Sequence, residues 1–500
     1  MKQNFKNLVE NSDLKSLVYF LIITSIVKLF FIALMPITPQ EAYYWYYSKN
    51  PDFSYFDHPP MAAYSIWLGT NIFGDNSFGV KFMAVVWSAL TQILLFLTAK
   101  RFFLQSVISQ NISIKAFKVV LVYNLTIFAH LYSVTIVPDT PLLFFWILSV
   151  YSIQEYFATS RNKYWLIAGI SLGLGMLSKY SMVLITLSIL SLIVMTKKYR
   201  SELKNINVYA AIFLSIVAFS PVLYWNFKHE WASFLFQTVE RAEKYKPFTL
   251  KYFFQLIGSQ LFMLTPFVFW IIIRALKESI KNWKTLLASR FLLLSAVIPI
   301  LLFTYVSFKS LVKMNWLLPA YLSAIILAVH FGFGITKKWL RNFFVAFSIT
   351  FILIGYLVMI IPNIPIGEGN TWSGWKETAQ NVYNLQTKFG GKKNIFIFGN
   401  SYKSASLLKF YLPDNQNTFA ENIFGKRALQ FDYWGIPDSL IGKNAIYVFD
   451  NRKEYKSFLP EVEKYFDKIE LMKEYHFGFY NKSTRIIKAY LCTNYHGIKK

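Results

Sequence analysis

The chain is poor in cysteine and in acidic residues, and each shortage excludes some kinds of protein or site. Its single cysteine, Cys492, excludes an internal disulfide framework and any metal site built from several cysteines. Only 26 of the 500 residues are Asp or Glu, against 52 Lys and Arg, so the formal net charge is +26. Such an excess can indicate nucleic-acid binding. Here the cations stand in short clusters between apolar runs, and we therefore predict no nucleic-acid partner.

Apolar residues are abundant, at 55% hydrophobic and 19% aromatic, which is too apolar for a soluble protein of this length. The first apolar run, 17–35, is too long for a signal-peptide core, and no small-residue cleavage site follows it, so we predict an uncleaved signal anchor. The whole pattern predicts an α-helical polytopic membrane protein. About eleven spans are expected, at 17–36, 79–99, 118–137, 141–157, 164–178, 181–196, 207–226, 251–274, 290–308, 314–333 and 341–362.

The basic residues predict the orientation of these spans. With the N-terminus inside, alternate loops collect most of the cations, and the short outer loops carry far fewer. The inner clusters are Lys2, Lys6 and Lys15; Lys100, Arg101 and Lys115; Arg161 and Lys163; Lys197, Lys198, Arg200 and Lys204; Arg274, Lys277, Lys281, Lys284 and Arg290; and Lys337, Lys338 and Arg341. An odd number of spans then exports the C-terminal segment.

The last part of the chain, after the final predicted span, no longer consists of long apolar runs. Short β-type runs at 394–398 and 445–449 alternate with a helical pattern at 404–411, which predicts a small α/β domain. We therefore expect a membrane domain over 1–362 and an extracytoplasmic domain over 363–500. The run 398–404 superficially resembles a phosphate loop. It lacks the G-x-x-x-x-G-K-[ST] spacing, and an exported domain has no ATP supply, so that interpretation is rejected.

The predicted outer loops carry the ionisable residues of interest. The first, 37–78, is long and places Glu41, Asp57 and His58 among aromatic residues at the membrane surface. The alternative interpretation is an interfacial aromatic belt with a few solvated charges. The second loop is short and holds Asp139 between two prolines, where it either caps the next helix or points into a cavity at membrane level.

Three lysines add cations near these carboxylates. Lys28 lies in the middle of the first span, where a charge is costly and indicates a functional site unless the side chain snorkels. Lys179 lies at an outer turn, and Lys313 precedes the outer start of another span. Either could be an ordinary interfacial lysine. Several carboxylates and cations on one membrane face indicate an anionic ligand together with acid–base chemistry.

An ordered set of motifs resembles one family. The set comprises Gln-Glu-Ala-Tyr-Tyr-Trp at 40–45, Tyr-Phe-Asp-His-Pro-Pro-Met at 55–61, and further pieces at 74–81, 138–142, 177–180, 225–234, 313–321, 374–375 and 405–413. It is similar to the bacterial membrane glycosyltransferases of the GT-C family 39 type, which are related to protein O-mannosyltransferases and lipid A aminoarabinose transferases. The match extends over nearly the whole chain.

The resemblance implies an inverting transferase of the bacterial inner membrane. It would move a sugar from a polyprenyl-phosphate donor to an extracytoplasmic acceptor, which would be lipid A, another envelope glycan or a protein. Because the donor is anchored in the membrane, surrounded by lipids, no nucleotide-binding fold is required. Fixed cations would stabilise the phosphate leaving group, and a carboxylate would accept the proton of an acceptor hydroxyl.

At some positions this chain has the residue that is usual in the family, and at others it has a different one. Many relatives have an Asp where this chain has Gln40, so the catalytic base falls to Glu41, Asp57 or Asp139, and no base is needed for a phosphate acceptor. His58 stands where relatives that modify lipid A have a phosphate-binding lysine, which makes activity more sensitive to pH. The expected substrate-binding residues are Lys28, Gln40, Tyr44, Tyr55, His58, Lys179, Tyr180, Trp225, Asn226, His229, Lys313 and Asn315. At Trp225 and His229, helix-anchoring aromatics are the alternative.

We predict no cofactor and no metal. Glu41, Asp57, His58 and Asp139 could form an oxygen-rich site for a divalent cation, but no tight ligand spacing is present. Two other functions stay open. A transporter or flippase of lipid-linked sugars would show internal repeats or paired broken helices, and the sequence indicates neither. A non-catalytic scaffold would not explain why Lys28 lies within a span or why acidic residues gather in the outer loops.

Overall fold

Two units make up the chain in the computed structural model, which describes residues 12–106, 111–243, 245–334, 337–362, 364, 371–451, 459–479 and 482–498. The helical unit comprises Met1–Ile32, His58–Ser65 and Lys81–Gly355, and the sheet unit comprises Ala33–Asp57, Ile66–Val80 and Tyr356–Lys500. The expected boundary after residue 362 adjoins 363 and 365–370, which lie outside the described residues, as do Lys2 and Lys6. That boundary stays a prediction.

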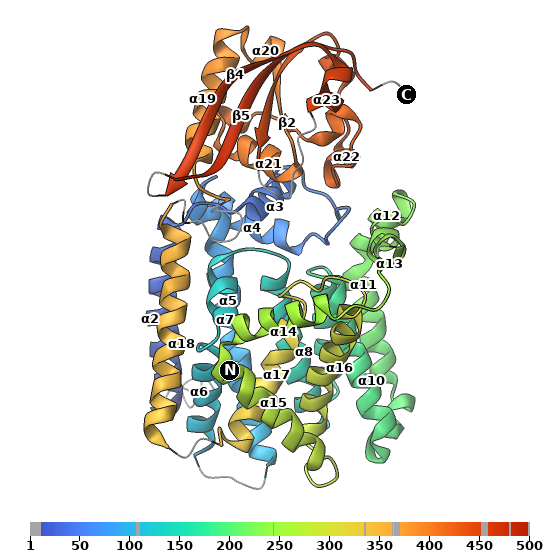
Figure 1. Cartoon of the computed structure of the whole chain (residues 1–500). Coiled ribbons are helices and arrows are strands. Elements are labelled where there is room, and N and C mark those ends of the chain that lie inside the picture. The colour runs from blue at the N-terminus through green and yellow to red at the C-terminus, as the bar shows by residue number, and fades with distance from the viewer. Residues whose placement is uncertain are drawn as a thin grey trace. The chain divides into compact units, whose positions relative to one another are not determined.

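The helical unit is built mostly from apolar helices, with a few short or polar ones between them (Figure 1). These are α2 (Ser12–Leu34), α5 (Ser77–Gln105), α6 (Ile112–Tyr123), α7 (Ile127–Val134), α8 (Asp139–Thr159), α9 (Lys163–Met176), η1 (Tyr180–Met182), α10 (Val183–Met195), η2 (Lys197–Lys204), α11 (Ile206–Lys228), α14 (Lys251–Leu264), α15 (Pro266–Lys281), α16 (Ser289–Ser307), α17 (Leu318–Phe331) and α18 (Lys338–Ile360). Between α11 and α14 lie the short α12 (Ala232–Leu235), η3 (Phe236–Glu240) and α13 (Arg241–Glu243). Each predicted span overlaps one or two of these helices.

Several spans are broken. Within the described residues, six helices are long and apolar enough to cross a membrane, or up to nine if each bent pair counts as one span. The bends are 74° between α6 and α7, 116° between α10 and η2, and 108° between α14 and α15. The last break has a local cause, because Thr265 has a positive φ of 64° and Pro266 starts the next helix. The sequence analysis found no sign of broken helices, and on this point it was wrong.

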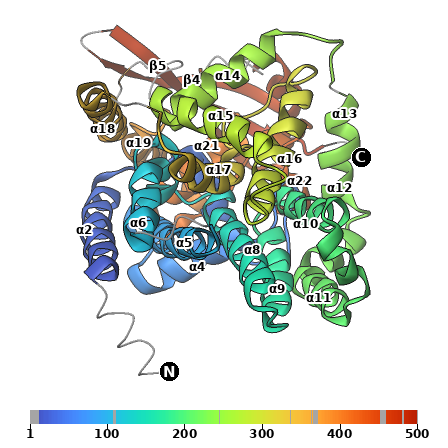
Figure 2. The same ribbon diagram turned by 90° about the horizontal axis from the view of Figure 1, so that it is seen from below.

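Helix α17 forms the core of the helical unit. Every residue from Leu318 to Ala328 is buried, and the helix packs against α6, α8, α15 and α16 (Figure 2). A helix that is apolar on all sides belongs in such a position. In contrast, only 11% of the most apolar window of α18 is buried, and 22% of that of α2 and of α11. Apolar surface of that extent is stable in lipid, so the chain is a multi-pass membrane protein.

Helices α9 and α11 approach closely through two glycines. Gly169 and Gly173 lie four residues apart, and a Cβ on Gly169 would stand 2.2 Å from the backbone oxygen of Ala211. A Cβ on Gly173 would stand 2.5 Å from the oxygen of Ser215. Small residues with this spacing let two membrane helices bring their backbones together.

We expect Gly169→Ala to lower the stability of the protein by about 1–3 kcal/mol, because the added methyl group forces α9 and α11 apart. Gly258→Ala in α14 is the matched control, since a Cβ there meets nothing within 4 Å. Thermal unfolding of both purified variants in one detergent measures the difference. An equal melting temperature for the two variants would show that α9 and α11 tolerate the separation.

The sheet unit contains α3 (Pro39–Lys49) and a five-stranded sheet in the order β2-β1-β3-β5-β4. Its strands are β1 (Ile395–Gly399), β2 (Thr418–Phe419), β3 (Asn444–Asp450), β4 (Phe466–Phe479) and β5 (Lys482–Tyr495). Strand β1 pairs in parallel with β2 and β3, whereas β5 runs antiparallel to β3 and β4. The helices are α19 (Trp375–Lys388), α20 (Gly391–Asn394), α21 (Tyr402–Tyr411), η4 (Pro413–Asn415), η5 (Glu421–Phe424), α22 (Gln430–Trp434), η6 (Asp438–Leu440), α23 (Leu459–Val462) and η7 (Glu463–Tyr465). Helix α4 (Met61–Phe73) belongs partly to each unit.

The structure confirms the α/β character predicted for the C-terminal region. The expected strands are β1 and β3, and the expected helix is α21. The run that resembled a phosphate loop is the start of α21, where the Ser401 hydroxyl accepts a hydrogen bond from the Ser404 backbone N–H at 3.2 Å. Strands β4 and β5 were not predicted. Most of β4 is partly or fully exposed. Its many charged residues interrupt the alternation of apolar and polar residues by which a strand is predicted.

Candidate active site

A buried carboxylate at the start of α8 is the centre of the candidate site. Asp139 is 3% exposed. Its Oδ1 accepts a hydrogen bond from Lys179 Nζ at 2.7 Å, and its Oδ2 accepts one from Asn315 Nδ2 at 2.6 Å. Both carboxylate oxygens are therefore engaged, one by a charged donor and one by a neutral donor. A charge-assisted pair of this kind fixes the orientation of the carboxylate.

Local backbone features bring the three residues together. Asp139 is the first residue of α8, where the positive end of the helix dipole favours an anion. Lys179 has an extended backbone between α9 and η1, so its side chain projects from the turn that separates two helices. Asn315 lies in the turn before α17. In each case a helix ends or begins at the candidate residue or within three residues of it, so the three side chains meet near helix ends.

Three cations of the same unit act electrostatically on His58. The Met61 backbone N–H donates to the Leu177 oxygen at 3.0 Å, which ties the segment after His58 to the turn that carries Lys179. Burial lowers the pKa of His58 well below its usual 6.5, and the charges of Lys179, Lys313 and Arg241 lower it further. The imidazole is therefore neutral near pH 7. In that form it serves as a hydrogen-bonding group rather than as a cation.

This pKa predicts how stability changes with pH. Since the folded-state pKa lies below 6.5, the unfolded chain binds a proton before the folded chain does, so stability falls as the pH drops below about 6.5. His58→Gln removes this titration, and its melting temperature should change less than that of the wild type between about pH 7 and pH 5. Parallel melting curves in one detergent test this. Identical pH slopes for the two proteins would mean that His58 is readily protonated in the fold.

In the sheet unit, two phenols hold a second buried carboxylate. Asp57 is 6% exposed and accepts hydrogen bonds from Tyr43 Oη at 3.0 Å and from Tyr47 Oη. Burial and the Asp57 charge raise the pKa of both tyrosines well above 10. Tyr55 stacks on Tyr47, with ring centroids 4.0 Å apart. The Gln430 side-chain oxygen accepts from the Phe56 backbone N–H at 2.7 Å, so the segment before Asp57 is also held.

Glu41 and Gln40 are engaged within α3. The Glu41 carboxylate accepts hydrogen bonds from the backbone N–H and the hydroxyl of Thr38, both at 2.9 Å, and these close a capping box at the start of the helix. Gln40 Nε2 donates to Tyr44 Oη at 3.1 Å. The structure thus gives Glu41 a role in the fold, and its proposed role as a base stays a prediction.

Lys28 belongs to a separate polar group inside the helical unit. Its side chain is 3% exposed, and Nζ donates to Ser88 Oγ at 3.3 Å. Gln92 Nε2 donates to the same hydroxyl at 3.3 Å, and Asn124 Nδ2 donates to Gln92 Oε1 at 2.7 Å. Lys28 therefore does not snorkel, and its contacts differ from those of the Asp139 group.

The predicted sugar-binding residues of the later loops contribute to the fold. The Trp225 and His229 rings stack 4.0 Å apart. Asn226 Oδ1 accepts from the Ser233 backbone N–H at 3.1 Å and closes the turn after α11. Tyr180, adjacent to Lys179, packs edge-on against Phe234 at 5.5 Å. Of these residues, Tyr180 is the one that follows Lys179 directly in the sequence, and the predicted sugar-binding roles stay predictions.

The sequence analysis missed Arg241, Tyr43 and Tyr47. Arg241 lies in α13, and its guanidinium stands 5.6 Å from the Trp316 ring centroid, one residue beyond Asn315. Cations in an outer loop depart from the positive-inside pattern, but this loop also carries Lys228 and Lys246, so the sequence did not single out Arg241. Tyr43 and Tyr47 lie four residues apart on one face of α3, which is the spacing that lets two side chains bind one group.

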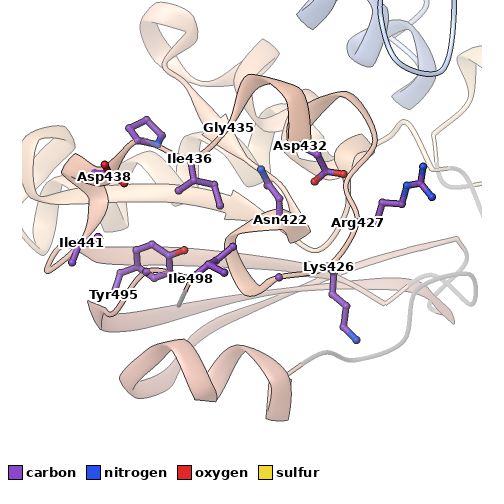
Figure 3. Close-up of a pocket in the computed structure, with 13 residues that line it drawn as sticks. Asn422, Lys426, Arg427, Asp432, Gly435, Ile436, Asp438, Ile441, Tyr495 and Ile498 are labelled. Atoms are coloured by element: carbon purple, nitrogen blue, oxygen red, sulfur yellow. The ribbon is translucent and has the colours of Figure 1, made fainter. Parts of the chain in front are cut away.

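A cavity of about 610 Å³ opens in the sheet unit, where α22 and η6 meet the end of β5 (Figure 3). Asn422, Arg427, Asp432 and Tyr495 are among its lining residues. Asn422 donates to the Phe431 oxygen at 3.0 Å, and the Asp432 carboxylate accepts from the Ala428 N–H at 3.0 Å. Burial raises the pKa of Asp432 above its usual value. The Asn422 and Asp432 side chains of this cavity are thus already bonded within the chain.

No group of three or more His, Cys, Asp or Glu side chains that could hold a metal occurs among the residues the structure describes. The metal site considered from the sequence combined residues of both units, with Glu41 and Asp57 in one and His58 and Asp139 in the other. The absence of a cofactor and of a metal stays a prediction.

Comparisons with known proteins agree with the resemblance. Residues 57–225 match the family described as dolichyl-phosphate-mannose-protein mannosyltransferase. The chain is 23% identical over 441 residues to the lipid A galacturonosyltransferase RgtD of Rhizobium johnstonii, covering 85% of this chain and 88% of that protein. It is 26% identical over 129 residues to the undecaprenyl phosphate-alpha-4-amino-4-deoxy-L-arabinose arabinosyl transferase of Wigglesworthia glossinidia brevipalpis, covering 26% of this chain and 22% of that protein.

The fold is similar to that of ArnT from Cupriavidus metallidurans. The apo crystal structure of ArnT matches with a TM-score of 0.65 at 11% identity, covering 95% of this chain and 98% of ArnT. The structure bound to undecaprenyl phosphate matches with a TM-score of 0.64 at 13% identity, covering 94% and 97%. Together the family model, the two relatives and this fold confirm the resemblance that the motifs indicated, and the chain is similar to GT-C glycosyltransferases of the family 39 type.

Proposed function

We propose that this protein transfers a sugar from a polyprenyl-phosphate donor to an acceptor outside the cytoplasm, with inversion at the anomeric carbon. The observation that carries the proposal is the buried Asp139, bonded to Lys179 and Asn315, in the same unit as Lys313 and Arg241. A group with more cations than carboxylates suits a phosphate ligand. The ArnT complex, which contains undecaprenyl phosphate, supports the same donor chemistry.

In this mechanism the acceptor oxygen attacks the anomeric carbon while the bond from that carbon to the phosphate oxygen breaks. Negative charge then accumulates on the departing polyprenyl phosphate. Lys179, Lys313 and Arg241 carry fixed positive charge around His58, and they would stabilise that charge. A neutral His58 would add a hydrogen bond to a phosphate oxygen.

An acceptor hydroxyl must lose its proton as the new bond forms. Asp139 is the proposed base, because its carboxylate bonds to Lys179, one of the cations that would hold the donor. Asp57 is the second candidate, because it accepts two phenol hydrogen bonds and is oriented by them. An acceptor phosphate would need no base. In that case Asp139 would serve to hold Lys179 in position.

The proposed location is the cytoplasmic membrane of a bacterium, with the Asp139 group and the C-terminal domain on the outer side. The loops expected inside carry most of the cations, and this charge distribution supports that orientation. The proposed acceptor is a glycolipid such as lipid A, because the named activity of the RgtD relative concerns lipid A. Other envelope glycans and proteins are the alternatives.

A transporter of lipid-linked sugars is the second candidate. The sequence argued against it because no broken helices were predicted, but the described part of the structure contains three bent helix pairs. One experiment separates the two. Purified protein in liposomes receives a labelled polyprenyl-phosphate sugar with lipid A, an envelope glycan or a peptide as acceptor. A transferase releases free polyprenyl phosphate in an amount equal to the labelled acceptor formed. Movement of intact donor across the bilayer without release would overturn the proposal. Glycolipids from cells with and without the gene, compared by mass spectrometry, then identify the product.

A further inference from the structure

A second cavity, of about 340 Å³, lies at the other end of α8 within the helical unit. Residues of α8, η2, the α15–α16 turn and α16 line it, and among them are Gln154, Phe157, Lys198, Tyr199, Thr285 and Phe291. Asp139 begins α8 and Gln154 follows fifteen residues later, a rise of about 22 Å along the helix. The cavity is therefore distinct from the Asp139 group.

Gln154 is the unusual residue of this cavity. Its side chain is 4% exposed, and neither its Oε1 nor its Nε2 has a hydrogen-bond partner within the described structure. Buried side-chain amides almost always have partners in folded proteins. Both groups are buried in the wall and are not open to the cavity, so a polar ligand would engage them when the Gln154 side chain turns toward it.

The walls of the cavity are held in place by other contacts. Tyr156 Oη donates to Glu202 Oε2 at 2.7 Å, which ties η2 to the end of α8. Arg290 Nη1 donates to Thr196 Oγ1 at 3.3 Å, which ties α16 to the end of α10. The Phe157 and Tyr199 rings lie 4.0 Å apart. A site that exists before its ligand arrives is typical of specific binding.

The lining combines one cation, one buried amide and several apolar side chains. Lys198 extends from η2, where Lys197, Arg200 and Lys204 add positive charge. Phe157, Leu192 and Phe291 form apolar walls. A molecule that satisfies all three features has an anionic head, polar groups next to it and an apolar tail. Anionic phospholipids have that chemistry, and cationic segments beside membrane helices attract them.

We propose that this cavity binds the headgroup and glycerol region of an anionic phospholipid. Lys198 contacts the phosphate, the Gln154 side chain turns so that its amide bonds to the ester or hydroxyl oxygens, and the acyl chains lie along the apolar walls. The proposal does not depend on the transferase reaction, because its ligand is neither donor nor acceptor.

Native mass spectrometry of the full-length protein in detergent tests it, with phosphatidylglycerol and phosphatidylcholine as probes. We expect phosphatidylglycerol to bind at least tenfold more tightly than phosphatidylcholine. Lys198→Gln and Gln154→Leu should each weaken its binding at least fivefold. Lys197→Gln is the matched control, because Lys197 is an exposed neighbour that does not line the cavity, and removing its charge should weaken binding far less than Lys198→Gln does.

Three results would overturn the proposal. Equal affinity for the two lipids would show that the cavity does not select a lipid by the charge of its headgroup. Unchanged binding in Lys198→Gln would place the lipid elsewhere, and this variant decides the matter even if Gln154→Leu does not fold, because Lys198 is exposed. Displacement of phosphatidylglycerol by an equal concentration of inorganic phosphate would show that the site takes a free anion rather than a lipid.

Discussion

Asp139→Asn is expected to lower the rate of sugar transfer about 100-fold or more. The asparagine has the same shape but cannot accept a proton, and loss of a positioned base reduces rates by roughly 10² to 10⁴. It also removes the charge that holds Lys179 Nζ at 2.7 Å. Release of polyprenyl phosphate under initial-rate conditions measures the effect. Glu278→Gln is the matched control, because Glu278 lies in α15 and pairs with its near neighbour Lys281.

The same assay ranks the three candidate bases. Asp57→Asn and Glu41→Gln are measured in parallel, with melting temperatures to separate a loss of stability from a loss of chemistry. We expect Asp139→Asn to show the largest fall in rate at constant fraction folded. A rate for Asp139→Asn within threefold of the wild type, while Asp57→Asn is inactive, would transfer the role of base to Asp57.

Lys179→Met is expected to damage both stability and activity. The Lys179 and Asp139 side chains are only 12% and 4% exposed, so the substitution leaves a buried carboxylate without its counter-charge. Breaking a buried pair in this way costs about 3–5 kcal/mol. Loss of a cation beside the leaving group should lower kcat/KM for the donor by about 10²–10³ as well. Melting temperature and donor turnover are measured on the same preparation.

A double variant separates the two effects. Lys179→Met combined with Asp139→Leu removes both charges, and an apolar pair of similar volume often restores stability. We expect its melting temperature to return most of the way to that of the wild type, while transfer stays undetectable. A double variant that melts as low as Lys179→Met would show that the ion pair is not the source of the instability. Recovery of transfer would show that neither residue takes part in the reaction.

Much of the fold could be predicted from the sequence because its signals are local. Runs of about 20 apolar residues predict spanning helices whatever their neighbours are. The bends could not be predicted in the same way, because hydropathy does not encode direction, although Thr265 and Pro266 were a visible signal for one of them. Strands β4 and β5 were missed because their stability comes from pairing with each other and with β3 rather than from their own composition.

By itself the sequence determined the class of the protein, its apolar segments and the residue types available for chemistry, since all of these depend on short stretches of chain. Only the tertiary structure decided which residues meet. Asp139 bonds to Lys179, 40 residues away, and to Asn315, 176 residues away, while Glu41 turns to Thr38 to cap its own helix. No local pattern encodes such contacts, because they arise where helix ends from distant parts of the chain come together around α17.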